Sequence, residues 1–168
     1  MIELTKKTQQ DFLNREWVQR LLDAGVNMSD AKYCIYAYKG FPEEEQYVAL
    51  TDDIDEVHAG VKILCPTYTV SELLYKLHEW VYPKIDGKEF SGGITMLKDA
   101  PFYMFYYKLR SKEYDPNKTY ASQPKEWNED YLYAEFEYPI ESLASLLIQC
   151  HTKDIGLVRK DTGDISDK

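Results

Sequence analysis

Apolar residues recur with the period of a helix in the middle of the chain. A capping box of Thr69 and Glu72 marks the start of this segment, because each side chain can accept a hydrogen bond from the other residue's backbone N–H. Pro83 marks the end, which predicts a helix over residues 69–82. The apolar positions form one stripe that a sheet or another helix must cover, namely Val70, Leu73, Leu74, Leu77 and Val81.

Two further segments show helical patterns. The first covers residues 8–24, with a cap at Thr8 and with Gly25 directly after its end. The second opens with Pro139 at its first position, where proline costs no hydrogen bond, and closes at Gly156. The sequence therefore predicts two or three helices.

Runs rich in β-branched and aromatic residues lie between these helices. Residues 33–38 are matched by residues 47–50 across an acidic loop, which predicts a hairpin. Gly92 and Gly93 are interpreted as a turn before a short strand at residues 94–97. The sequence thus places three strands on the two sides of the middle helix.

Two later segments differ in how their apolar residues are spaced. Residues 102–109 are apolar at successive positions, as in a strand buried on both faces, so we expect an inner strand there. Residues 131–138 alternate between apolar and polar, which predicts a strand with one wet face near the edge of a sheet. The segment 111–130 between them has no usable period and is longer than most connections.

The order of these elements is α-β-β-α-β-β-β-α. Hairpin-linked strands are antiparallel, so the order predicts an α+β fold with a single antiparallel sheet of about five strands and two or three helices. With 168 residues in all, we expect one domain over residues 1–158 and a flexible tail over residues 159–168.

Cysteine usage and hydropathy narrow the class of protein. Cys34, Cys65 and Cys150 lie far apart without a Cys-x-x-Cys pair, so we expect reduced thiols in the core and neither disulfide nor metal site. No segment approaches the roughly 20 apolar residues of a membrane span. The expectation is a cytoplasmic protein without a cofactor and without membrane contact.

The net charge of −9 is concentrated in two acidic runs. Residues 41–60 carry seven acids and residues 126–145 carry six, and neither run contains Lys or Arg. A solvated acidic surface is one interpretation. The alternative is a negative patch that imitates nucleic acid and acts as a decoy for a DNA-binding defence protein, provided that the runs share one face.

Four residues are candidates for a binding site. Tyr75 and His78 share one helical stripe, and a small enzyme with a site there or near His151 is an alternative hypothesis. Tyr103 and Tyr107 lie near several bases, a pairing used to stack single-stranded nucleic acid, but packing in the core also explains them. Because the net charge opposes a polyanion, we do not expect a nucleic-acid partner.

Three segments resemble small uncharacterised proteins of gut anaerobic bacteria, their prophages and integrated elements. The segments are residues 22–33, residues 65–69 leading into Leu73 and Leu74, and the closing helix at residues 143–150. The resemblance spans residues 8–156 and implies a bacterial or phage protein of the cytosol, without implying a chemistry. Since no reactive constellation is assembled in the sequence, the leading hypothesis is a non-enzymatic accessory protein that acts by contact with a protein partner or by self-association.

Overall fold

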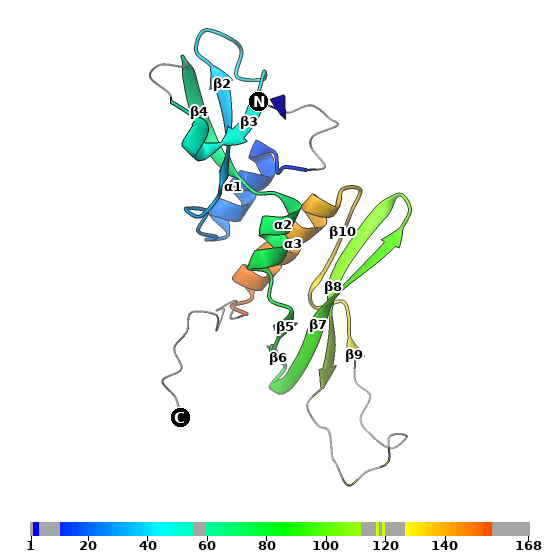
Figure 1. Cartoon of the computed structure of the whole chain (residues 1–168). Coiled ribbons are helices and arrows are strands. Elements are labelled where there is room, and N and C mark those ends of the chain that lie inside the picture. The colour runs from blue at the N-terminus through cyan, green and yellow to red at the C-terminus, as the bar shows by residue number, and fades with distance from the viewer. Residues whose placement is uncertain are drawn as a thin grey trace.

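The computed structural model describes residues 2–3, 11–55, 60–111, 117, 119 and 127–155. Three helices and two antiparallel sheets make up the described chain (Figure 1), so the predicted α+β fold is confirmed. The strands divide between two sheets, whereas the sequence predicted one sheet of about five strands. The predicted tail lies outside the described residues, as does most of the segment 111–130.

The first sheet has four strands in the order β1-β3-β2-β4 and is called the four-stranded sheet. It contains the predicted hairpin, β2 (Tyr33–Tyr38) and β3 (Tyr47–Leu50), with β1 (Ile2–Glu3) at one edge. A short 3-10 helix, η2 (Thr51–Asp53), follows β3. At the other edge lies β4 (Val61–Thr67), which the sequence analysis missed. Pro66 obscured this strand, and such a proline fits because β4 is an edge strand.

The second sheet follows the order β10-β8-β7-β5, with β6 and β9 paired at its side, and is called the six-stranded sheet. Its centre is a long hairpin of β7 (Lys88–Asp99) and β8 (Phe102–Ser111). The predictions of β8 as an inner strand and of β10 as an edge strand are confirmed. The remaining strands are short: β5 (Trp80–Val81), β6 (Lys84–Ile85), β9 (Trp127–Asn128) and β10 (Tyr133–Phe136).

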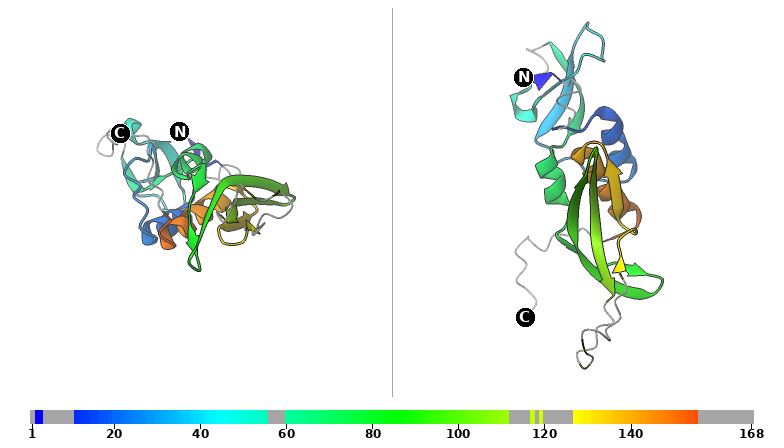
Figure 2. Two further views of the ribbon diagram at one scale, coloured as in Figure 1. Left: turned by 90° about the horizontal axis from the view of Figure 1, so that it is seen from below. Right: turned by 90° about the vertical axis from the view of Figure 1, so that its right-hand side faces the viewer.

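The helix α3 (Pro139–Thr152) lies at the centre of the molecule. It packs on β8 and β10 with one side and on α1 (Arg15–Asp23) and α2 (Val70–Lys76) with others. The right view of Figure 2 shows the six-stranded sheet in front of α3, with the sheet's opposite face toward the viewer. The side chains of α3 are therefore buried on most of its circumference, as those of Leu143, Leu146, Leu147 and Cys150 show.

Two predicted helices are shorter in the structure. α1 begins only at Arg15, because the side chain of Asn14 accepts a hydrogen bond from the Trp17 backbone N–H at 3.0 Å and acts as the N-cap. The capping box of Thr69 and Glu72 is present as predicted, but α2 ends at Lys76 rather than at residue 82. The cause is tertiary, since residues 80–81 pair with β7 as β5 and thereby leave the helix.

The predicted turn at Gly92 and Gly93 is wrong, because both residues lie inside β7. A Cβ atom on Gly92 would lie 2.1 Å from the backbone oxygen of Lys108 on β8, so only glycine fits at this position. Glycine in a strand interior often marks such a close approach of another backbone. The glycine pair therefore serves strand packing and not chain reversal.

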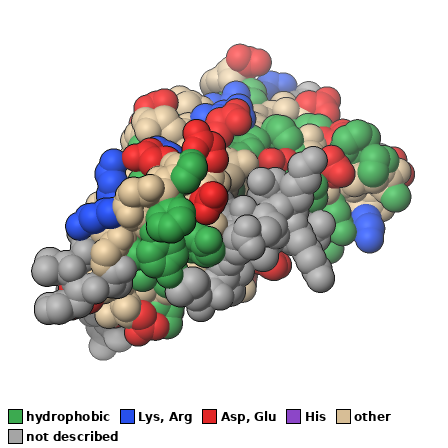
Figure 3. Space-filling view, turned by 90° about the horizontal axis from the view of Figure 1, so that it is seen from above, with side chains coloured by type: hydrophobic (Ala, Val, Ile, Leu, Met, Phe, Trp, Pro, Cys, Tyr) green, Lys and Arg blue, Asp and Glu red, His purple; other side chains and the backbone are tan. Residues whose placement is uncertain are grey.

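The acidic runs lie in different parts of the fold. Residues 43–45 belong to the loop between β2 and β3, whereas residues 129–130 follow β9 beside the six-stranded sheet. Glu43 pairs with Lys62 at 2.9 Å and with Arg15 at 3.4 Å. Figure 3 shows acidic side chains intermixed with Lys and Arg on the face seen from above. The decoy hypothesis, which needs both runs on one face, gains no support from this placement.

Candidate binding surface around Tyr75 and Trp80

Exposed aromatic side chains gather where α2 gives way to β5. α2 directs Leu74 and Tyr75 outward, and β5 buries Val81 while Trp80 points to solvent. Tyr75, Trp80 and Tyr82 are 61%, 58% and 68% exposed. Clustered apolar side chains of this kind often mark an interaction site. The aromatic surface is the name used below for Leu74, Tyr75, Trp80 and Tyr82.

Three hollows meet at Tyr75. One of about 620 Å³ lies between α2 and β5 and is lined in part by Leu74, His78 and Trp80. A second of about 450 Å³ lies between α2 and the segment that leads into β2. A third of about 280 Å³ extends from Tyr75 toward Leu147 on α3. Because Tyr75 contributes to the lining of all three, a partner that fills any of them would contact it.

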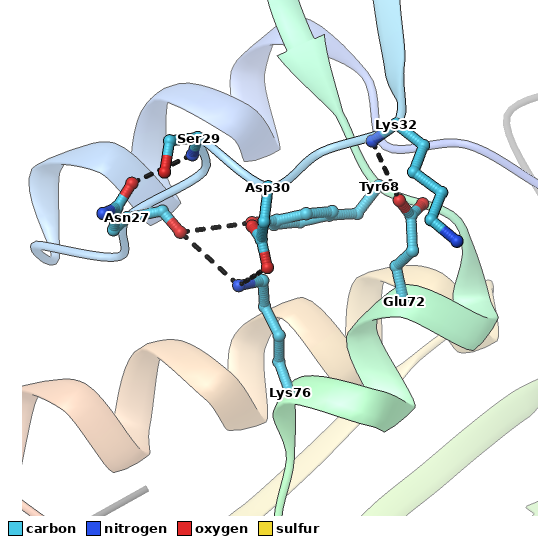
Figure 4. Close-up of polar contacts among 7 residues, drawn as sticks. All are labelled: Asn27, Ser29, Asp30, Lys32, Tyr68, Glu72 and Lys76. Carbon is cyan, nitrogen blue, oxygen red and sulfur yellow. Dashed lines mark hydrogen bonds and ion pairs between the residues drawn. The ribbon is translucent and has the colours of Figure 1, made fainter. Parts of the chain in front are cut away.

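A polar cluster borders the second hollow (Figure 4). The carboxylate of Asp30 lies 2.8 Å from the Lys76 ammonium and accepts a hydrogen bond from the Tyr68 hydroxyl at 2.7 Å. The Glu72 carboxylate accepts a hydrogen bond from the backbone N–H of Lys32 at 3.1 Å. The cluster therefore ties the turn before β2 to α2 and fixes the position of the helix that carries Tyr75.

Burial and hydrogen bonding set the protonation states in this cluster. Desolvation raises the pKa of Tyr68, and its hydrogen bond to Asp30 raises it further. Burial alone would raise the pKa of Asp30, but hydrogen bonds from Lys76 and Tyr68 favour the carboxylate and bring its pKa below the ordinary value. Asp30 therefore stays ionised at neutral pH and holds the Lys76 ammonium at the edge of the hollow.

Trp80 connects the aromatic surface with the six-stranded sheet. It pairs directly with Gly93 on β7, and residues opposite each other in an antiparallel pair point to the same face. A Cβ atom on Gly93 would lie 3.6 Å from the indole ring. The absence of a side chain at Gly93 thus leaves room for the indole over the sheet.

The four residues predicted for binding do not form one site. Tyr75 and His78 line the same hollow. Tyr107 is fully buried, and its hydroxyl donates a hydrogen bond to the His78 backbone oxygen at 2.6 Å. The backbone oxygen of Tyr103 accepts a hydrogen bond from Ser142 on α3 at 2.7 Å. Tyr103 and Tyr107 therefore belong to the side of the sheet that packs on α3, which agrees with the core interpretation of both.

The histidines do not form an acid–base site with the described residues. His78 Nε2 is buried and has no hydrogen-bond partner there, so no described carboxylate orients it. His151 lines the third hollow, and desolvation together with the nearby Lys76 lowers its pKa. Within the described ranges, no group of three or more His, Cys, Asp or Glu residues could hold a metal ion. The enzyme hypothesis therefore lacks a specific observation in its favour.

Sequence reasoning missed Trp80, Tyr82 and the polar cluster. Trp80 and Tyr82 were assigned to the middle helix, although a run of Trp, Val and Tyr before a proline is also typical of a short strand. Asp30, Tyr68 and Lys76 come from three separate segments, and nothing in their spacing indicates that they meet.

None of the helices among the described residues has the length and apolar character that a membrane crossing requires. A scan against protein-family models, a search of curated proteins and a search of solved structures find no match to this chain. Its function is therefore argued from the surface described above.

Proposed function

We propose that this chain is a non-enzymatic accessory protein that acts by contact with another protein through the aromatic surface. The observation that carries the proposal is the exposure of Tyr75 and Trp80, each more than half accessible, on a common hollow, with the equally exposed Tyr82 two residues after Trp80. Tyr and Trp are enriched at protein interfaces because they bury a large ring while keeping one polar group. The resemblance to proteins of gut bacteria and their prophages supports a bacterial or phage origin and a cytoplasmic location.

The polar cluster supports a protein partner over a small apolar ligand. Lys76 and Asp30 stand at the rim of the aromatic surface, and a polar rim around an apolar centre is the usual arrangement of a protein–protein interface. The hollows lie beside one another around Tyr75, as a surface for several side chains of a partner would, and they do not form one enclosed chamber.

Affinity purification from the source cell with mass spectrometry tests this proposal. The bait is the full chain, compared with a Tyr75→Ala/Trp80→Ala double variant and with a matched control, Phe41→Ala. Phe41 is 63% exposed but lies near the four-stranded sheet, away from the aromatic surface. We expect one or more proteins captured by the wild type and by the control and lost with the double variant.

Two results would contradict the proposal. In one, nothing is enriched above background by the wild-type chain. In the other, the same proteins are captured equally by all three baits, which would place the contact on another part of the surface. Circular dichroism of the double variant checks that its fold is intact, because both residues are exposed and their loss should leave the core unchanged.

A further inference from the structure

The two faces of the six-stranded sheet are covered differently. Side chains alternate along a strand, and the register of β7 with β8 places Tyr107 and Leu109 on the face that α3 buries. The opposite face, called the outer face below, carries Trp80, Thr95, Leu97, Phe102, Met104 and Tyr106. No described helix or strand covers it, as the right view of Figure 2 shows.

The outer face carries apolar side chains that remain in contact with water beside a buried middle, since Tyr106 is only 8% exposed. Leu97 is 49% exposed and Phe102 is 42% exposed, on neighbouring strands. Tyr106 lies in the middle of β8 beside Tyr133 of β10, with ring centroids 6.3 Å apart. Exposed apolar side chains grouped on one face of a sheet often mark an interaction surface.

The charges on the outer face are separated along the strands. Asp99 and Glu135 lie toward the turn of the β7–β8 hairpin, at the register of Phe102 and Met104. Lys108 and Arg110 lie toward the other end of β8, where Lys108 is 3.7 Å from Glu129. The face therefore has an acidic end and a basic end with the apolar centre between them.

We propose that the outer face binds the outer face of a second copy of this chain, with the strands of the two copies running in opposite directions. A two-fold axis that crosses the strands near Tyr106 brings the acidic end of each copy over the basic end of the other. The same rotation sets Leu97 of one copy over Gly93 and Trp80 of its partner, so a large side chain meets a small one. Such an interface uses one patch twice, as two-fold interfaces do.

The size of the outer face sets the expected strength of this dimer. β8 has ten residues, which gives a length of about 34 Å, and four strands span about 14 Å. Each copy then contributes about 500 Å², and the total of about 1,000 Å² is near the lower limit for specific interfaces. We therefore expect a reversible dimer with a Kd in roughly the micromolar range.

This inference goes beyond the proposed function and uses different residues in its tests. The partner contact depends on Tyr75 and Trp80, whereas the variants below leave both unchanged. Trp80 lies on both surfaces, so the two proposals are distinguished by their readouts: sedimentation of the Leu97 variant tests the dimer, and capture of other proteins by the Tyr75 and Trp80 variant tests the partner contact.

The first test is sedimentation velocity of the full chain over concentrations from about 1 µM to 1 mM. We expect a shift from monomer to dimer, and a wild-type chain that stays monomeric throughout would overturn the proposal. The sharp comparison is between Leu97→Glu and Met96→Glu. Met96 is 58% exposed and adjacent in sequence but belongs to the opposite face of β7.

Leu97→Glu should weaken dimerisation by at least about 30-fold, since it places a charge in the desolvated centre of the interface. Met96→Glu should leave dimerisation within about 3-fold of the wild type. Equal effects of the two substitutions, or no effect of Leu97→Glu on an existing dimer, would show that the outer face is not the interface.

The second test reverses charges at the two ends of the outer face. Its result is a comparison between two variants measured alone and the same two variants measured as a mixture. Lys108→Glu and Glu135→Lys each create like charges across the proposed interface, so each variant alone should dimerise about 10-fold more weakly. An equimolar mixture should form a one-to-one heterodimer, because every cross-interface pair is then of opposite charge. Failure of the mixture to dimerise better than its components would overturn the antiparallel arrangement.

Discussion

The two sheets of this molecule bury their side chains in different ways. The six-stranded sheet packs one face on α3 and shares a large hydrophobic cluster with all three helices. Among the described residues, the four-stranded sheet has a separate and smaller cluster of three buried side chains, those of Phe12, Ile35 and Val48. A sheet that lies on a deep core resists local opening more than one that does not.

The four-stranded sheet compensates with aromatic pairs across its strands. Tyr36 and Tyr47 stack at 5.7 Å between ring centroids, and Tyr38 meets Tyr47 edge-on at 5.4 Å. Such pairs contribute about 0.5–1.5 kcal/mol each beyond the burial of their area. Burial also raises the pKa of Tyr36 to about 12, so the phenol stays neutral under most conditions. The comparison teaches that one chain can stabilise one sheet by depth of packing and another by contacts along its surface.

The largest expected effect tests the close approach of the β8 backbone to Gly92 inside the six-stranded sheet. Gly92→Ala should destabilise the protein by more than about 4 kcal/mol or prevent folding, because the new Cβ would collide with the backbone of β8. Gly93→Ala is the matched control, and its Cβ would make only ordinary contacts, so we expect a loss below about 1 kcal/mol. Urea unfolding followed by circular dichroism measures both. Similar losses would show that the approach of β8 to Gly92 is not tight.

The second prediction compares the two clusters directly. Leu143→Ala in α3 should lower the free energy of unfolding by about 3–4 kcal/mol, and Val48→Ala in β3 by about 1.5–2.5 kcal/mol. Hydrogen exchange shows which parts of the protein each substitution destabilises. Leu143→Ala should reduce protection throughout the described helices and strands, whereas Val48→Ala should reduce it mainly in β2, β3 and β4. Equal loss of protection everywhere from both variants would mean that the sheets unfold as one unit.

A smaller effect is expected at the junction between the two sheets. The chain passes there from β4 into α2. The Thr67 hydroxyl donates a hydrogen bond to the Leu13 backbone oxygen at 2.7 Å, and the Leu13 backbone N–H donates one to the Tyr68 backbone oxygen at 3.1 Å. Thr69→Ala removes one half of the capping box and should cost about 1 kcal/mol. Thermal unfolding measures the loss, and Thr69→Ser, which keeps the hydroxyl, should restore most of it. If serine gave no recovery, the cap would not be the cause.

The smallest effect concerns the ion pair of Asp30 and Lys76, which joins the turn before β2 to α2. The pKa of Asp30 is lowered in the folded state, so the folded protein binds fewer protons at this site than the unfolded chain. Its stabilisation is thus present above the ordinary pKa of Asp, about 4, and is lost as pH falls through the lower folded pKa. Asp30→Asn should cost less than about 1 kcal/mol at pH 7, because the pair is partly solvated.

Urea unfolding of the wild type and of Asp30→Asn between pH 2.5 and 7 checks this sign. The difference in stability between them should shrink as pH falls below about 4, while the other carboxylates affect both proteins alike. A difference that grew at acidic pH would contradict the assignment of the lowered pKa to Asp30.

How far the sequence predicts this structure depends on whether a feature is local. The capping box at Thr69, Pro139 at the start of α3 and the alternation in β10 are set by near neighbours, and each was predicted correctly. The end of α2 was not predicted correctly, because it depends on the pairing of Trp80 with Gly93, which lies on a strand further along the chain. The division into two sheets depends equally on which strands meet, and no local pattern encodes that choice.

The candidate site shows the same limit. Tyr75 was identified because its place on a helix face follows from the period alone. Trp80 was assigned to that helix, and the Asp30–Lys76 pair joins residues from distant segments. Tyr107 has the composition of a binding residue, but its ring packs beneath α3 and its hydroxyl is bonded to a backbone oxygen. Residue type alone does not separate a buried tyrosine from an exposed one.

The central position of α3 has a consequence for synthesis. α3 follows every strand of the sheet that it covers, so the ribosome makes β7 and β8 before the helix that buries their inner face. About 30 residues separate the end of β8 from the start of α3, a delay of roughly 2–6 seconds at cellular rates of translation. During that interval the nascent hairpin exposes Phe105, Tyr107 and Leu109, and chaperones that bind apolar strands have their opportunity to act.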